Sequence, residues 1–254
     1  MNHSNDLLAN LRRESSERIV IEGRIALERA LEAGVPIACA AGVASQLERL
    51  SWPAHTTLTA MSRDELDALV GFSFHRGVVG ALRRDRWQPS IPSNVGPMFL
   101  GVALFGLADP SNIGAIIRSA AAFGADAVFV DDGSADPFSR RSTRAAMAAN
   151  FCVPVCVVER RSLIDALRAR VCGLRVIAFS AEGDTEVQTV TSSRPELLVF
   201  GHEGSGLPTE ILERSDLRVQ IPTPGSIGSL NVATTAAIAL YQLASRPPLT
   251  GAKV

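Results

Sequence analysis

The chain has 254 residues, which is enough for one or two domains, and 46% of them are apolar while 20% are charged. These proportions exclude a disordered chain. The formal charge of −1, from 25 basic and 26 acidic residues, excludes a protein that binds polyanions through overall charge alone, although a local basic patch remains compatible with it. Every basic residue except Lys253 is arginine, which suits phosphate binding but also follows from codon bias.

Cysteine use and apolar runs indicate a soluble protein, and we expect it in the cytoplasm. The four cysteines, Cys39, Cys152, Cys156 and Cys172, form no CxxC pair. Cys152 and Cys156 lie in an apolar run, which predicts buried thiols rather than metal ligands or disulfides. The first residues lack the apolar core of a signal peptide, and no run of about 18 apolar residues predicts a membrane span.

The first part of the chain, which we assign to residues 1–86, alternates helix-like and strand-like segments. Ser62 and Glu65 have the spacing of a capping box, which predicts that a helix begins there. The predicted elements are a helix at residues 22–33, a strand at 36–40, a helix at 63–70 and a strand at 77–82. Residues 87–97 contain three prolines and predict a linker between two domains.

The second domain, predicted at residues 98–254, alternates apolar strands with helices. The predicted strands are residues 99–105, 127–130, 153–158, 175–179, 197–200 and 217–221. The predicted helices are residues 112–123, 139–149, 162–169, 208–214 and 230–243, and Ser162 and Asp165 predict a cap for the third of them. Unbroken apolar strands separated by helices predict an α/β fold with a mostly parallel sheet covered on both faces.

Ligands bind such sheets at the carboxyl ends of the strands, where three unusual loops are predicted. These loops are residues 107–118, 200–208 and 221–231, and the last two are rich in Gly or Pro. The chain has no GxGxxG, P-loop, GxSxG or HExxH pattern, so dinucleotide binding, P-loop chemistry, serine hydrolysis and zinc proteolysis are not supported. With only four histidines, a His-rich metal site is not expected either.

Five polar side chains of these loops are candidates for function, and each has a structural alternative. Asn112 suits the N-cap of its helix. Arg118, among small apolar residues, either meets a ligand or lies exposed on a polar stripe. Glu203 either approaches a ligand or is a solvated residue of a tight turn. Ser229 and Asn231 begin the last helix, where one of them can cap it or both can bind a ligand.

The three loops resemble the motifs of the SpoU (TrmH) family of RNA ribose 2′-O-methyltransferases, in the SPOUT superfamily. The matching residues are Asn112-Ile-Gly-Ala-Ile-Ile-Arg118 with Gly124, then Gly201-His-Glu203-Gly-Ser-Gly206-Leu207, then Ile221-Pro222 with Ser229-Leu230-Asn231-Val232. Residues 136–147 also resemble a family segment. The resemblance covers about residues 98–244. Residues 1–86 resemble, more loosely, the small ribosomal-protein-like RNA-binding domain of many members.

Some positions depart from the family pattern. Ala146 and Ala148 stand where members often have Ser and Gly, and Arg76 stands where Gln is frequent. Thr223 and Pro224 stand where Met and a small residue are common. Since the first motif and Ser-Leu-Asn are intact, these departures bear on the RNA target more than on the chemistry.

The resemblance implies a trefoil-knotted sheet that binds S-adenosylmethionine in the knot. The cofactor-binding residues that it implies are Gly201, Gly206, Ile221, Ser229 and Leu230. A backbone rich in Gly and Pro can offer N–H and C=O groups to a purine without crowding from side chains. The resemblance also implies a homodimer formed through the last helix and the first-motif helix, while burial of the last helix within one chain is the alternative.

The resemblance gives Arg118 the central catalytic role. Arginine does not deprotonate in proteins, so we expect Arg118 to clamp the target phosphate and stabilise the forming alkoxide rather than act as a base. Asn112 and Asn231 would orient the ribose and Arg118. Glu203 would fix Arg118 or its own loop, and Ser229 would position the acceptor.

The expected partner is RNA, with 23S rRNA favoured over tRNA, and no metal is expected. The predicted RNA-binding residues are Arg76, Arg83, Arg84, Arg140, Arg141 and Arg144. For the last three, a solvated helix start is the alternative. A non-catalytic member that binds RNA or the ribosome is the second functional alternative, and an enzyme for another nucleotide is the third.

Overall fold

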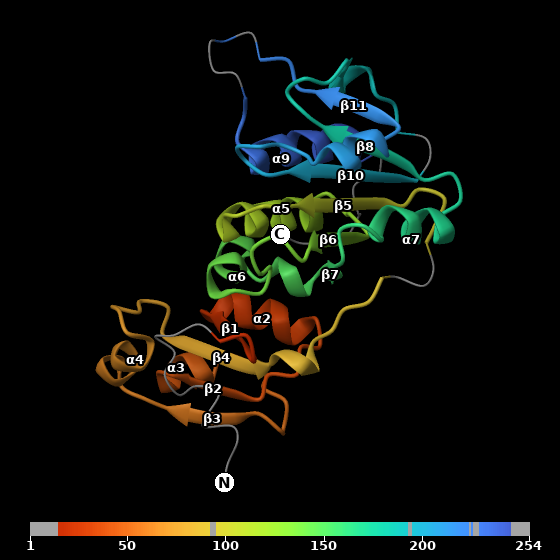
Figure 1. Ribbon diagram of the computed structural model, residues 1–254. Helices are drawn as coiled ribbons and strands as arrows, with labels where there is room; N and C mark the ends of the chain where they lie inside the picture. The colour runs from red at the N-terminus through yellow and green to blue at the C-terminus, as the bar shows by residue number, and fades with distance from the viewer. Residues whose placement is uncertain (1–14, 92–94, 193–194, 224, 226–228, 245–254) are drawn as a thin grey trace.

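The protein is described by a computed structural model that covers residues 15–91, 95–192, 195–223, 225 and 229–244. It contains two β-sheets, and Figure 1 shows them one above the other with helices between them. The smaller sheet is built from residues 18–83 and the larger from residues 100–220. The exact domain limits that we assigned stay a prediction.

The smaller sheet has the strand order β1 (Arg18–Glu22), β4 (Val78–Arg83), β2 (Cys39–Gly42) and β3 (Thr57–Ala60). β4 pairs antiparallel with both of its neighbours, whereas β2 and β3 are parallel. The helical segments of this part are α2 (Arg24–Glu32), α3 (Ala44–Leu47), α4 (Arg63–Val70) and the 3₁₀ helix η1 (Arg84–Arg86). The predicted capping box of α4 is confirmed, because Ser62 and Glu65 exchange side-chain-to-backbone hydrogen bonds.

The larger sheet is parallel throughout, which confirms the predicted α/β class. Its strand order is β7 (Val155–Val158), β6 (Ala127–Asp131), β5 (Leu100–Phe105), β10 (Glu196–Gly201), β8 (Arg175–Phe179), β11 (Leu217–Gln220) and β9 (Thr185–Glu186). The central strand β10 therefore lies beside β5, although four other strands separate the two along the chain. The carboxyl ends of all seven strands meet at one edge of the sheet.

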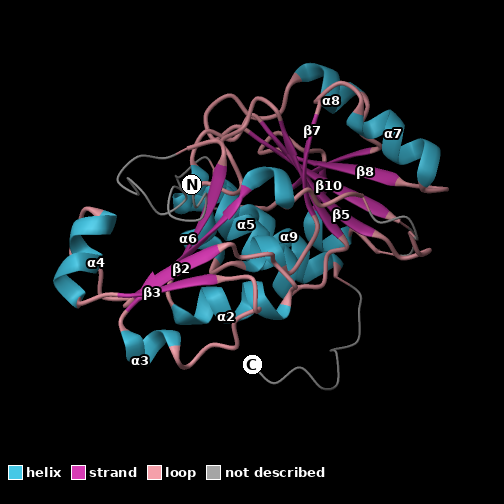
Figure 2. Ribbon diagram, turned by 90° about the horizontal axis from the view of Figure 1, so that it is seen from below, coloured by secondary structure: helices cyan, strands magenta, loops and turns pink. Residues whose placement is uncertain are grey.

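Helices cover both faces of this sheet (Figure 2). One face carries α5 (Pro110–Ala122), α6 (Arg140–Ala146), the 3₁₀ helices η2 (Ala149–Phe151) and η3 (Val187–Thr189), and α9 (Val232–Leu243). The other face carries α7 (Leu163–Arg170) and α8 (Thr209–Glu213). Along β5, Val102 and Leu104 pack toward α5, while Ala103 and Phe105 pack toward α7, because successive side chains of a strand point to opposite faces.

One continuous apolar core joins the two sheets. Ile19 and Leu27 of the first part belong to the same buried cluster as Val102 of the second. Trp87, in the predicted linker, packs edge to face on Phe151 with ring centroids 5.6 Å apart. The first part is therefore packed firmly against the second.

Two predictions about helix starts are wrong. Helix α5 begins two residues before Asn112 and is capped by Asp109, whose carboxylate accepts a hydrogen bond from the Ser111 amide at 2.8 Å. Pro110 occupies the first helical position, where its missing amide costs nothing. Ser162 precedes α7 but makes no side-chain cap.

The helix predicted at residues 139–149 ends early. Met147 and Ala148 adopt φ of 52° and 62°, in the left-handed region that an α-helix cannot contain. The prediction of buried thiols is confirmed for Cys156 but wrong for Cys152, which is exposed. Three strands, β1, β3 and β9, were not predicted.

In the part of the chain that the structure describes, no helix is long and apolar enough to cross a membrane. The trefoil knot stays a prediction.

Candidate functional site

Two of the three loops meet because their strands are neighbours. β5 and β10 pair in parallel with Phe105 opposite Gly201, so the segments that follow them leave the sheet side by side. The backbone amide of Ala108, after β5, donates to Glu203 Oε2 at 3.4 Å. Position in the sheet thus brings the first and second motifs together.

A chain of side-chain amides links all three loops. Asn112 Nδ2 donates to Glu203 Oε1 at 2.8 Å, and Asn231 Nδ2 donates to Asn112 Oδ1 at 3.1 Å. Asn231 also caps α9, since its Oδ1 accepts from the amides of Ala233 and Thr234 at 2.8 and 3.3 Å. The helix amides can only donate and an ionised carboxylate can only accept. These two ends of the hydrogen-bond series therefore fix the orientation of both asparagine side chains.

The carboxyl group of Glu203 is the acceptor at one end of this series of hydrogen bonds. Partial burial by itself would raise the pKa of Glu203, but hydrogen bonds from Asn112 and from the backbone amides of Ala108 and Asp109 hold it below its ordinary value. Glu203 is therefore ionised throughout the neutral range, where it is a hydrogen-bond acceptor and a poor proton donor.

A buried carboxylate stabilises the loop after β5 through hydrogen bonds. The Asp131 side chain is fully buried and accepts hydrogen bonds from the Gly106 amide at 2.9 Å, from Ser134 Oγ at 2.5 Å and from Arg160 at 2.6 Å. Ser134 Oγ in turn accepts from the Leu107 amide at 2.9 Å. These bonds fix the backbone just before the Ala108 amide that contacts Glu203.

A cavity of about 650 Å³ opens at the carboxyl ends of β8, β10 and β11. Its lining includes Phe179 and Phe200, whose rings stack with centroids 4.9 Å apart. The five residues predicted to bind the cofactor all line it, namely Gly201, Gly206, Ile221, Ser229 and Leu230. Residues 224 and 226–228 of the third loop lie outside the described residues.

The second loop folds tightly at the wall of this cavity. A Cβ atom on Gly201 would lie 2.4 Å from the backbone of Gly206 and Leu207, so only glycine fits there. His202 Nδ1 accepts hydrogen bonds from the amides of Gly204 and Ser205 at 2.9 and 3.2 Å.

The structure brings together four of the five predicted catalytic residues. Glu203, Ser229 and Asn231 line the cavity, and Asn112 is bonded to two of them. Arg118 does not line the cavity; it is exposed on α5 and has no hydrogen-bond or ion-pair partner among the described residues. Glu203 thus contacts Asn112 and Ala108 rather than Arg118.

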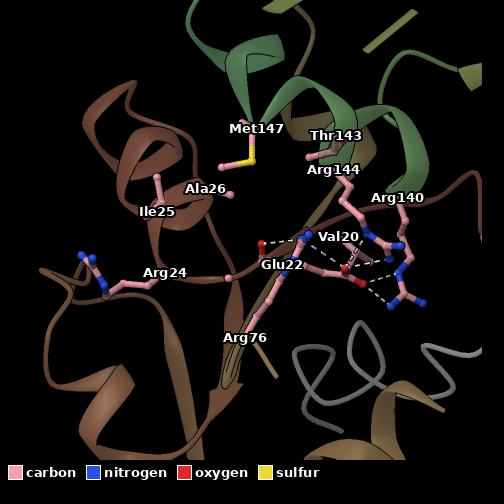
Figure 3. A pocket seen from close by; sticks show the side chains of 11 residues that line it. Val20, Glu22, Arg24, Ile25, Ala26, Arg76, Arg140, Thr143, Arg144 and Met147 are labelled. Atoms are coloured by element: carbon pink, nitrogen blue, oxygen red, sulfur yellow. Dashed lines mark hydrogen bonds and ion pairs between the residues drawn. The ribbon is translucent and has the colours of Figure 1, made fainter. Parts of the chain in front are cut away.

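The six arginines predicted to bind RNA all have carboxylate partners within the described chain. Arg83 pairs with Asp85 at 2.8 Å, Arg84 with Asp136 at 2.8 Å and Arg141 with Asp109 at 3.3 Å. Arg140, Arg144 and Arg76 converge on the buried Glu22 (Figure 3). Their assignment to RNA stays a prediction, and Glu22 adds a second role for three of them, which is to join the two parts of the molecule.

Sequence reasoning missed Asp131, Arg160 and His202. The available signal for Asp131 was an acidic residue that closes an apolar strand. Nothing in the sequence placed Arg160 beside it, because Asp131 ends β6 whereas Arg160 lies just after the neighbouring strand β7, 29 residues further along the chain. Among the described residues, no group of three or more His, Cys, Asp or Glu side chains could hold a metal ion.

The sequence pattern of the SpoU rRNA Methylase family matches residues 100–241. The chain is 38% identical over 135 residues to the 23S rRNA (guanosine(2553)-2′-O)-methyltransferase RlmP of Bacillus subtilis, covering 53% of this chain and 54% of that protein. It is 36% identical over 186 residues to Mb0905 of Mycobacterium bovis, which is named an uncharacterized tRNA/rRNA methyltransferase, and the match covers 71% of this chain and 64% of that protein. The matched segments thus span between half and two thirds of these relatives.

A solved structure covers nearly the whole fold. The SpoU methyltransferase AviRb of Streptomyces viridochromogenes, in complex with the cofactor AdoMet, superposes with a TM-score of 0.80 at 26% identity. The superposition covers 96% of this chain and 97% of AviRb. The likeness therefore includes both sheets.

Proposed function

This chain belongs to the SpoU rRNA methylase family, and from that premise we propose that it transfers the methyl group of S-adenosylmethionine to a ribose 2′-hydroxyl of RNA. The observation that carries the proposal is the joining of three motif loops by Glu203, Asn112 and Asn231 beside one large cavity. A methyl transfer needs such a fixed frame, because the acceptor oxygen and the methyl carbon have to be aligned in line.

The cavity suits an adenosyl group in size and chemistry. Phe179 and Phe200 give its lining an apolar part for a purine face, and the glycine-bearing loop at residues 201–206 gives backbone groups that can bond the purine edge. Gly201, Gly206, Ile221, Ser229 and Leu230 would hold the cofactor. The cofactor supplies an electrophilic methyl group on a sulfonium, and AviRb is one related protein that has been crystallised with it.

The residues of this chain would divide the remaining work. Asn112 and Asn231 are held in one orientation and position the ribose, while Glu203 anchors Asn112 to the loop after β10. Ser229 offers a hydroxyl at the cavity wall for the acceptor. Arg118 binds the target phosphate and stabilises negative charge on the ribose oxygen as its proton leaves.

A homodimer is part of the proposal. One face of α9 is buried within the chain through Ala236, Ala239 and Leu240, while Ile238 and Tyr241 on its other side remain exposed. Arg118, exposed on the neighbouring α5 and outside the cavity of its own chain, would complete the site of a second copy. Catalysis would then require two chains.

The RNA that we favour is 23S rRNA, because the related RlmP is named for that substrate, and the protein would then act in the cytoplasm. Transfer RNA is the alternative, since Mb0905 is named for either class. The test is to incubate the purified protein with labelled S-adenosylmethionine and total bacterial RNA, and then to map 2′-O-methyl positions.

Variants of Arg118 test the catalytic assignment. Arg118→Ala should retain cofactor binding in calorimetry but lose at least about a hundredfold in transfer rate. Arg118→Lys should also lose methyl transfer if the planar guanidinium group of arginine is needed. Wild-type-like transfer by Arg118→Ala refutes the role. Cofactor binding by the wild type without transfer to any RNA would instead indicate a non-catalytic binding protein.

A further inference from the structure

A second cavity lies between the two parts of the molecule, and no residue of the three motif loops lines it. This junction cleft has a volume of about 260 Å³ and lies between the start of α2 and helix α6 (Figure 3). It shares no lining residue with the larger cavity. Its walls come from both parts, so any ligand in it would contact both.

The junction cleft has more positive than negative charge. Glu22, with a 4% exposed side chain, uses one carboxylate oxygen for Arg140 and the other for Arg144, and each arginine donates two N–H groups. Arg76 lies 3.7 Å from the same carboxylate and donates at 3.4 Å only to the backbone carbonyl of Glu22. Three guanidinium groups therefore face one carboxylate, which Arg140 and Arg144 already saturate.

Two of these cations are open to solvent. The side chains of Arg76 and Arg144 are 40% and 41% exposed, against 13% for Arg140. Arg24, at the edge of the cleft, points away from Glu22 in Figure 3 and pairs with Glu28 on its own helix. Arg76 and Arg144 are thus the groups that an anion entering the cleft would meet.

The remaining wall of the junction cleft is apolar. Ile25 is 48% exposed and lies across from Met147, which ends α6 (Figure 3). A site with an apolar wall and planar guanidinium groups matches a nucleotide, whose base stacks on such surfaces while its phosphate bonds arginine. A phosphate alone would not use the apolar wall.

We propose that the junction cleft binds one nucleotide of single-stranded RNA, with Arg76 and Arg144 as its phosphate contacts and Ile25 and Met147 as its apolar wall. The inference rests on the proposed function in that RNA is the substrate. Helix α6 connects the two sites, because Arg141, one residue after Arg140, donates to Ser111 Oγ at 2.7 Å beside Asn112. A strand held in the cleft could therefore follow α6 toward the candidate active site.

The test measures binding of a labelled ten-uridine oligoribonucleotide by fluorescence anisotropy at several salt concentrations. Arg76→Gln should weaken binding about tenfold and lower the slope of log Kd against log salt by about 0.7, the value for one contact to a single strand. Ile25→Ala should weaken binding about threefold and leave the salt slope unchanged, because it removes no charge. The same probe paired with ten adenosines should bind without sensitivity to either change.

The matched controls are Arg63→Gln, an exposed arginine of α4, and Leu58→Ala, an exposed leucine of β3, neither of which lines the junction cleft. Equal effects of Arg76→Gln and Arg63→Gln, equal sensitivity of the duplex, or no binding of the single strand by the wild type would overturn the inference. Cofactor binding by calorimetry should be unchanged in every variant. If the wild type methylates RNA and the cleft variants bind the oligoribonucleotide as tightly as the wild type does, this inference alone is refuted. If binding depends on the cleft residues but the wild type methylates no RNA, only the proposed function is refuted.

Discussion

At the scale of single residues, the site depends on the direction of hydrogen bonds. Asn112 donates one hydrogen bond to Glu203 and accepts one from Asn231, so it cannot be replaced by a group that only accepts. Because the pKa of Glu203 lies below its ordinary value, its stabilising contribution is present at neutral pH and is lost only as the pH falls through that lowered pKa.

Replacing Asn112 by aspartate tests this direction. Asn112→Asp would put a second carboxylate 2.8 Å from Glu203, and the repulsion raises the pKa of one group of the pair. We expect the melting temperature at pH 8 to fall by about 3 °C more than in Asn112→Ala, and the difference to shrink toward pH 5 as the pair gains a proton. A difference that is independent of pH would contradict this account.

Thiol reactivity reports burial of individual cysteines. Burial raises the pKa of Cys39 and of Cys156 to about 11. It also raises the pKa of Cys152, but Cys152 and Cys172 are exposed, so a reagent in solution can reach them. At pH 8 only about one buried thiol in a thousand is ionised, so a disulfide reagent should titrate two thiols in the native protein and four after unfolding. Mass spectrometry should locate the two fast sites at Cys152 and Cys172; fast labelling of Cys39 would show the prediction to be wrong.

Residue types and spacing predicted the members of the site better than their partners. The motifs identified Asn112, Glu203 and Asn231, because Asn and a Gly-flanked Glu are unusual after apolar strands. The bonds among them could not be predicted, since they join positions 91 and 119 residues apart. Asn112 was expected to cap α5, but the neighbouring Asp109-Pro110 pair is the stronger start signal and left Asn112 free to bond elsewhere.

At the scale of elements, helices α5 and α6 cross at one glycine. A Cβ on Gly114 would lie 2.3 Å from the carbonyl oxygen of Ser142 and 2.8 Å from Ala145 Cβ. The obstacle is backbone, which cannot rotate away. This crossing sets where α6 lies, and with it the arginines that reach Glu22.

Gly114→Ala should therefore destabilise the protein even though alanine is the better helix former. The propensity gain of about 1 kcal/mol is smaller than the cost of separating the helices, and we expect a net loss of about 2 kcal/mol in urea unfolding. Gly96→Ala is the control, since no atom lies within 4 Å of its added Cβ, and it should change stability by less than about 0.5 kcal/mol. Equal stabilities of the two variants would mean that the crossing can relax.

The periodic elements of the larger sheet were predicted within a few residues, because long apolar runs identify buried parallel strands. The short strands β3 and β9 were missed since their side chains are only half covered and show no apolar run. Helix α6 was predicted too long because the alanines after it have high helix propensity. The left-handed backbone angles of Met147 and Ala148 end the helix in spite of that propensity.

At the scale of the whole molecule, one buried carboxylate joins the two sheets. Glu22 ends β1, while Arg140 and Arg144 belong to α6 of the other part. Removing one partner of a buried ion pair leaves charge without compensation, which costs more than removing the whole pair.

Glu22→Gln should lower the free energy of unfolding by about 3 kcal/mol, because two guanidinium groups lose their counter-ion. The combined variant Glu22→Leu, Arg140→Met and Arg144→Met should lose less, since the two cations bonded to Glu22 are removed with it and only Arg76, which is 40% exposed to solvent, loses its partner. Glu28→Gln, which breaks the exposed pair with Arg24, is the control and should cost less than about 0.5 kcal/mol. A Glu22→Gln variant as stable as this control would show that the cluster contributes little to the junction.

The place of β10 has a consequence for synthesis of the chain. Until residue 201 has left the ribosome, β5 and β8 flank an empty slot, and each presents a row of unsatisfied peptide groups. A nascent chain that stalls before this point would expose two unpaired strand edges at once. Truncated translation products should therefore aggregate rather than persist as partly folded monomers.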